Sequence, residues 1–180
     1  MTNKKPWEEF PHIWKTKSSF LAWLRGSIRR ACWNKSPIKL GVIKKQRKRV
    51  MNPKTGNEVW GGTCYVCGED FLQKDLQVDH IVGEHSLKEI SDIQSFVEAM
   101  TCLSENDLAL ICKSCHSCKT HSQRYGMTFE EAVIEKRLIQ LMKMPVKQIT
   151  ELLDKHNLSS NNATVRKENL RKLLEMGEIE

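Results

Sequence analysis

Two pairs of cysteines constrain this sequence more than any other feature. Cys64 and Cys67 form one C-x-x-C pair, Cys112 and Cys115 form a second, and 44 residues lie between the pairs. Four thiolates are a ligand set that Zn²⁺ favours in closed, tetrahedral structural sites. The insert is longer than the spacing in small zinc ribbons, so it must fold as an element of its own. The pattern therefore predicts one structural zinc site that closes a folded segment.

Two other uses of the cysteines fit the sequence less well. The chain has seven cysteines, and an odd number argues against a framework of disulfides. Residues 112–116 also read C-x-x-C-H, the attachment pattern of c-type haem. Haem attachment requires export, and it would leave Cys64 and Cys67 without a role. We therefore interpret the four paired cysteines as zinc ligands.

The N-terminus and the hydropathy pattern indicate where the chain resides. The first residues, MTNKKPWEEFPHIW, contain no apolar stretch followed by a cleavage site, so we expect no secretory signal and a reducing cytoplasm. No run of 18 apolar residues occurs, so we expect no membrane partner.

Charge is distributed unevenly along the chain. Residues 1–60 contain 15 Lys and Arg against 3 Asp and Glu, whereas residues 61–126 contain 5 against 10. A basic arm ahead of an acidic, cysteine-bearing middle predicts phosphate contacts in the arm and cation binding in the middle. A solvated basic face is the alternative. We expect a nucleic acid as the partner, contacted by Arg29, Arg30, Lys44, Lys45, Arg47, Lys48 and Arg49.

Hydrophobic periodicity predicts an α+β chain. The expected elements are a helix over 17–33, a hairpin over 50–60, a strand over 76–82 and a helix after a capping box at 86–89. An apolar run at 107–112 precedes a helix that begins near Ser114. Three further helices are expected over 128–143, 146–158 and 166–176.

Asp79, His80 and His116 remain once the cysteines are assigned to zinc. A carboxylate and an imidazole suit a harder ion with open positions, such as Mg²⁺ or Mn²⁺. A further histidine beside such an ion can take a proton from water near neutral pH. Together these groups predict hydrolysis of a phosphodiester bond. Spacing alone does not assign the individual roles.

The string CYVCG…LQVDHIV…DLALICKSCHSCKT resembles the HNH endonuclease family, the zinc-stapled branch of the ββα-metal nucleases. The resemblance is close over residues 61–121, and the flanks look like those of small bacteriophage HNH proteins. It implies two antiparallel strands and a helix around one catalytic divalent ion, and cleavage of DNA, in the host cytoplasm if the chain is phage-encoded. It also implies Asp79 and His116 as ligands of that ion, His80 as general base, and the zinc staple Cys64, Cys67, Cys112 and Cys115.

The sequence departs from the family at one position. Asp107 stands where the family usually has an asparagine that braces the loop between the strands and helps to orient the base, and Asn106 precedes it. Either residue can accept hydrogen bonds in that role. The departure leaves a non-catalytic, zinc-stapled nucleic-acid-binding protein as the alternative function.

The resemblance and the charge pattern together divide the chain into four parts. These are a basic N-terminal helix, arm and hairpin (1–60), an HNH ββα-metal core stapled by a four-cysteine zinc site (61–126), a flanking helix (127–143) and a C-terminal helix-loop-helix (144–180). The last part resembles a SAP-like DNA-binding tail, although a plain helical hairpin fits equally well. DNA is the expected partner, and phage or host proteins are further candidates.

Overall fold

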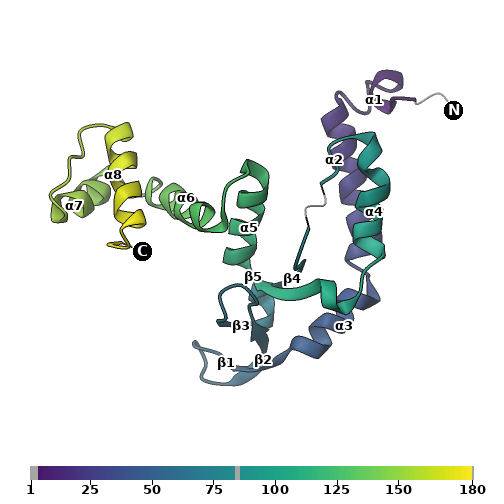
Figure 1. Ribbon diagram of the computed structural model, residues 1–180, viewed down its shortest axis with the longest axis horizontal. Helices are drawn as coiled ribbons and strands as arrows, with labels where there is room; N and C mark the ends of the chain where they lie inside the picture. Colours follow the sequence, from purple (N-terminus) through teal and green to yellow (C-terminus); the bar gives the residue numbers. More distant parts are fainter. Residues whose placement is uncertain (1–3, 84–85, 180) are drawn as a thin grey trace. The chain divides into compact units, whose positions relative to one another are not determined.

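A computed structural model of the chain describes residues 4–83 and 86–179 (Figure 1). It confirms the α+β class, with many helices and two small antiparallel sheets. The chain divides into two compact units, residues 1–113 and 114–180. Within the described ranges, no helix combines the length and the apolar character that crossing a membrane requires.

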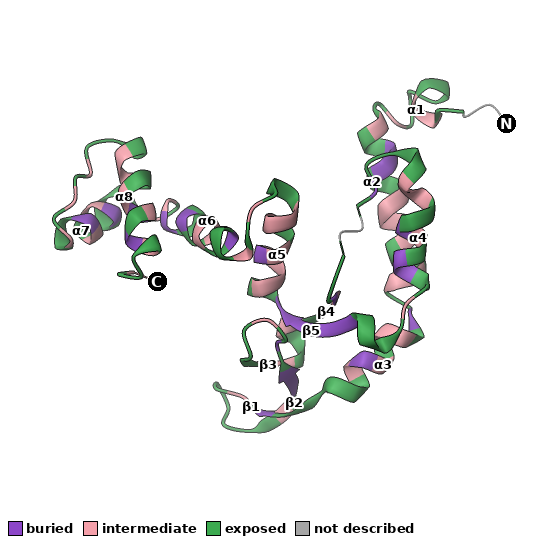
Figure 2. Cartoon of the chain, in the orientation of Figure 1, coloured by how far each residue is buried: buried purple, intermediate pink, exposed green. Residues whose placement is uncertain are grey.

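The first unit contains several helices, and two of them, from separate parts of its sequence, share a buried core. Thr16 caps the second helix of the chain, because its hydroxyl accepts a hydrogen bond from the backbone N–H of Ser19 at 3.1 Å. Phe20, Leu21, Phe96 and other apolar residues form the buried core of this region, shown in purple in Figure 2. The helices are α1 (Pro6–Glu9), α2 (Lys17–Ile28), a π-helical turn (Arg29–Trp33), α3 (Pro37–Gln46) and α4 (Ile93–Thr101).

The predicted hairpin is present and belongs to a three-stranded sheet. Strands β1 (Lys48–Met51), β2 (Glu58–Thr63) and β3 (Asp70–Leu72) pair antiparallel in that order. Val50 lies opposite Val59. Gly56 lies in the turn between β1 and β2 with a φ of 68°. Residues with a Cβ rarely adopt this left-handed backbone conformation.

Two adjacent glycines allow β2 to approach its neighbours closely. A Cβ at Gly61 would lie 2.2 Å from the carbonyl oxygen of Phe71, and one at Gly62 would lie 2.6 Å from Cδ1 of Leu110. The contact with backbone excludes a side chain at Gly61, whereas a side chain at Gly62 would require the buried Leu110 side chain to shift. Gly61 is therefore a packing requirement of the sheet.

The second sheet contains the predicted strand and the apolar run. Strand β4 (Leu76–His80) pairs antiparallel with β5 (Leu108–Cys112), so that Leu76 lies opposite Cys112. All five residues of β5 are buried. The side chain of Gln46 binds β5 as a strand would: its amide donates to the carbonyl oxygen of Leu108 at 3.4 Å and its oxygen accepts from the N–H of Leu110 at 3.0 Å.

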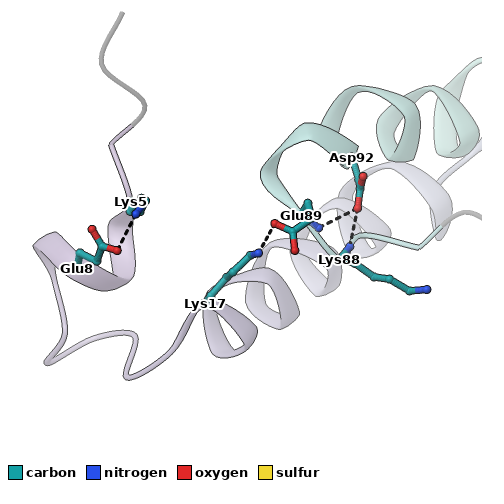
Figure 3. A network of polar contacts seen from close by, with 6 residues as sticks. All are labelled: Lys5, Glu8, Lys17, Lys88, Glu89 and Asp92. Carbon is teal, nitrogen blue, oxygen red and sulfur yellow. Dashed lines mark hydrogen bonds and ion pairs between the residues drawn. The ribbon is translucent and has the colours of Figure 1, made fainter.

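The predicted capping box at 86–89 is wrong by three residues. Glu89 and Asp92 form the box instead, at a short 3₁₀ turn (Ile90–Asp92) that precedes α4. The Asp92 carboxylate accepts hydrogen bonds from the backbone N–H groups of Lys88 and Glu89, and Lys17 of α2 pairs with Glu89 (Figure 3). The bonds from Glu89 and Lys88 lower the pKa of Asp92. Asp92 rather than Ser86 accepts the hydrogen bond from the backbone N–H of Glu89, because an ionised carboxylate is a stronger acceptor than a hydroxyl.

The described residues of the second unit form helices joined by turns and loops, and they contain no strand. Thr128 caps α6 in a box with Glu131, at the start of the helix expected over 128–143. Leucines from three helices, among them Leu138, Leu153 and Leu170, are fully buried together. Glu135 of α6 pairs with Arg171 of α8. The helices are α5 (Lys113–Tyr125), α6 (Phe129–Leu141), α7 (Val146–Lys155) and α8 (Ala163–Glu175).

Candidate metal centre

The first cysteine pair lies in a tight knuckle that follows β2. The N–H of Gly68 donates to the carbonyl oxygen of Cys64 at 2.9 Å, and the N–H of Cys64 donates to that of Glu69 at 2.9 Å. Gly68 has a φ of 75°. The N–H of Tyr65 donates to the carbonyl oxygen of Leu110 at 2.9 Å, so the knuckle is tied to β5.

The second pair lies where β5 gives way to α5. Cys112 is the last residue of β5, and Cys115 is in the first turn of α5. The Sγ atoms of Cys64, Cys67, Cys112 and Cys115 all lie within 4.8 Å of one another. A tetrahedral Zn²⁺ with Zn–S bonds of about 2.3 Å requires sulfurs about 3.8 Å apart. The four cysteines can therefore hold a structural metal such as zinc, as predicted.

Ionisation of Cys64 is favoured in this setting. Burial raises the pKa of its thiol, but hydrogen bonds to the sulfur outweigh burial and bring the pKa down to about 7, against an ordinary 9.0. The donors are the backbone N–H groups of Cys112, Cys67 and Val66 and the side chain of Cys67. Because Zn²⁺ binds the thiolate, these donors prepare the site for metal.

His80 lies at the end of β4, beside Asp79, and is buried with 8% of its surface exposed. Its Nε2 is 2.8 Å from the carbonyl oxygen of Ala99. Because a carbonyl oxygen can only accept, Nε2 carries the proton in the neutral ring, and the basic lone pair lies on Nδ1. The ring also stacks on Trp33, with centroids 4.9 Å apart and planes 17° apart.

The π-helical turn supplies two of the groups around His80 and Asp79. Trp33 ends this turn, and the ammonium of Lys39 lies 5.0 Å from the centre of its ring. Arg29 begins the turn. Partial burial lowers the pKa of Arg29, repulsion by Arg25 lowers it further, and attraction by Asp79 opposes the shift. Arg29 thus acts electrostatically on Asp79, and π-helical turns occur frequently at functional sites.

Asp107 closes a 3₁₀ turn (Glu105–Asp107) ahead of β5. Its carboxylate accepts hydrogen bonds from the N–H of Ser104 at 2.7 Å and from the Ser104 hydroxyl at 2.8 Å. These bonds lower its pKa, and attraction by His80 contributes. Its backbone carbonyl accepts from the N–H of Ile81 at 2.8 Å. Asp107 therefore braces the residue that follows His80, while Asn106 is exposed and lines a hollow of about 260 Å³ with Ile81 and Lys45.

His116 follows Cys115 directly in α5 and is half-buried. The sequence signal that singles it out is its adjacency to the fourth cysteine. Trp33 and Ala99 are contacts of His80 that sequence reasoning missed. Both lie far from His80 along the chain, and no local pattern could have indicated them.

The seven basic residues predicted to contact phosphate are all exposed, but they differ in their surroundings. Lys45 pairs with Glu105 at 3.1 Å, and Lys48 pairs with Asp70 at 2.8 Å. In residues 4–83 and 86–179, no carboxylate pairs with Arg47 or Arg49; both guanidinium groups lie over the ring of Trp60 instead.

Comparisons of the chain with family models, with curated proteins and with solved structures found no match.

Proposed function

We propose that this chain is a metal-dependent DNA endonuclease of the HNH type, which hydrolyses phosphodiester bonds with His80 as the general base. The setting of His80 carries the proposal. The imidazole is buried beside Asp79, its Nε2 is bound to the carbonyl oxygen of Ala99, and its ring is stacked on Trp33. These contacts hold one tautomer in one orientation, which a general base requires.

The backbone around the site supports the same proposal. Strands β4 and β5 are antiparallel, and α5 begins at the residue after β5. This order of elements is the one that a ββα-metal core needs. The four-cysteine cluster, with one member at the end of β5 and one in the first turn of α5, is suited to staple that core.

Each residue has a definite role in the proposed reaction. Asp79 and His116 would hold Mg²⁺ or Mn²⁺, which when bound stabilises charge on the scissile phosphate and on the leaving 3′ oxygen. His80 accepts the proton of the attacking water at Nδ1. Its Nε2–H group keeps its hydrogen bond to the carbonyl oxygen of Ala99. Asp107 keeps the chain after His80 in place through its backbone carbonyl.

Cleavage of supercoiled plasmid tests the proposal. Purified protein should convert the plasmid to nicked or linear forms when Mg²⁺ or Mn²⁺ is added, and His80→Ala should abolish the conversion while the zinc content and the fold, measured by circular dichroism, are retained. His12→Ala, which removes an exposed histidine, is the matched control and should cleave normally. Undiminished cleavage by His80→Ala would place the base elsewhere.

One observation favours a second function, a zinc-stapled protein that binds nucleic acid without cutting it. An aspartate occupies the position of the family's asparagine, and its carboxylate is engaged by Ser104. In that case the wild-type protein retains zinc and retards plasmid on a gel but leaves it supercoiled with every divalent ion tested. Asp107→Asn, which preserves an acceptor for Ser104, should then restore cleavage if this position alone is responsible.

A further inference from the structure

Trp60 lies on the exposed face of the three-stranded sheet. In β1 and β2, Val50 and Val59 face inward, whereas Arg49 lies directly opposite Trp60 and both are exposed. Trp60 has 41% of its surface exposed. A tryptophan in that position has no core to fill, so its contacts must be made on the surface.

Two guanidinium groups make those contacts. The Cζ atoms of Arg47 and Arg49 lie 4.2 and 4.4 Å from the centre of the Trp60 ring. At such distances a guanidinium is attracted to the π face and its rotamers are restricted. The ring therefore holds two long, flexible side chains in fixed places.

The two arginines repel each other, and nothing in the described part of the chain neutralises them. The Cζ atoms of both arginines lie within 4.4 Å of the centre of the Trp60 ring. Glu58 is on the same side of β2 as Trp60, but no ion pair joins it to either arginine among the described residues. Lys48, which points to the other side, is already paired with Asp70. An anion bound by the two guanidinium groups would relieve the repulsion.

We propose that Arg47, Trp60 and Arg49 form a clamp for backbone phosphates of duplex DNA, in which Trp60 orders the two arginines. The choice of DNA rests on the proposed function. The Trp60 ring already binds two guanidinium groups, which favours a contact with backbone phosphate over stacking of single-stranded bases on the ring. Paired, immobilised guanidinium groups match phosphate geometry and carry no sequence preference. The clamp thus supplies affinity and leaves base selection to other groups.

The test compares two double variants that remove the same charge from the same segment. Arg47→Gln/Arg49→Gln removes the clamp, and Lys45→Gln/Lys48→Gln removes two ion-paired lysines. Binding of a fluorescent DNA duplex is measured by anisotropy at several salt concentrations, without added Mg²⁺ or Mn²⁺, so that the result does not depend on cleavage. The clamp variant should lose affinity, and the slope of log K against log salt should fall by about 1.8; the lysine variant should lose much less.

Trp60→Leu isolates the role of the ring, because it keeps every charge. It should weaken duplex binding severalfold, with zinc content and melting temperature as controls for folding. Three outcomes would overturn the clamp: equal losses for the two double variants, wild-type binding by Trp60→Leu, or losses confined to single strands. Loss of plasmid cleavage in His80→Ala with unchanged duplex binding separates the catalytic proposal from this one.

Discussion

Trp33 offers a way to test the proposed base without removing it. Trp33→Leu keeps an apolar side chain but removes the aromatic face on which His80 stacks. We expect kcat for plasmid cleavage to fall by about tenfold to a hundredfold, because small displacements of a catalytic group are costly. KM should change little, since Trp33 touches the base and not the proposed phosphate contacts.

Two controls separate this positioning role from a structural one. Trp33→Phe should restore most of the rate, because it restores a ring. Trp23→Leu removes an exposed tryptophan that packs on Trp14 and Phe20, and it should leave kcat unchanged. A rise in KM with normal kcat, or no rescue by phenylalanine, would argue against the role of the stack.

Cys64 predicts how zinc binding depends on pH. Its pKa is about 7 in the folded chain and 9.0 ordinarily, so the folded state binds fewer protons between these values. In the folded, metal-free chain the Cys64 thiolate that Zn²⁺ requires is therefore the main form above about pH 7 and becomes protonated below it. We expect the apparent affinity for Zn²⁺ to decrease as the pH falls from about 8 to about 6, because protons compete with the metal for the sulfur, as measured by competition with a zinc-binding dye. An increase over that range would contradict this assignment.

At the scale of elements, the Gly61-Gly62 pair makes a prediction about the first sheet. A Cβ at Gly61 would lie 2.2 Å from a backbone oxygen and 2.4 Å from Cγ2 of Val50. Gly61→Ala should lower the free energy of unfolding by about 1–3 kcal/mol through overpacking, as measured by denaturant unfolding. In Gly26→Ala, the control within α2, the nearest group is the flexible end of Arg30 at 3.3 Å. That control should be neutral or stabilising by up to about 1 kcal/mol.

Local signals predicted most elements, and competing signals explain the errors. Thr128 with Glu131, a helix cap, and the alternating burial along β4 are strong local patterns, and the helix and the strand expected there are both confirmed. The expected elements do not include helix α3, because a proline after a helical pattern also indicates the end of the preceding helix. Pro37 is the first residue of α3, with Ser36 as cap, which is the ordinary role of proline at a helix start. The π-helical turn has no sequence signal of comparable strength.

The candidate site was predictable to the extent that it is local. The C-x-x-C spacing indicated the four-cysteine cluster because the two cysteines of each pair are only three residues apart, so that one turn of the backbone brings their sulfurs together. The setting of His80 was not predictable, since Trp33 and Ala99 reach it only through tertiary packing. The clamp at Trp60 depends similarly on strand register, which fixes Arg49 opposite Trp60.

For the molecule as a whole, the division into two units predicts two unfolding events. The buried leucines of α6, α7 and α8 all lie after residue 127, and this segment contains no cysteine. Zinc removal should therefore melt the zinc-dependent part of the chain, because metal binding there is folding free energy. The helices α6–α8 should persist. Circular dichroism of the full chain with a chelator should retain part of its helical signal, with a cooperative transition on heating.

A substitution in the second core identifies that remaining transition. Leu153 is fully buried, so Leu153→Ala should destabilise the α6–α8 core by about 2–5 kcal/mol. In the chelated protein it should shift the surviving transition to lower temperature. Val146→Ala, at an exposed position of α7, should leave that transition in place. One transition that disappears entirely on chelation would mean that the stability of α6–α8 depends on the metal, although their core contains none of its ligands.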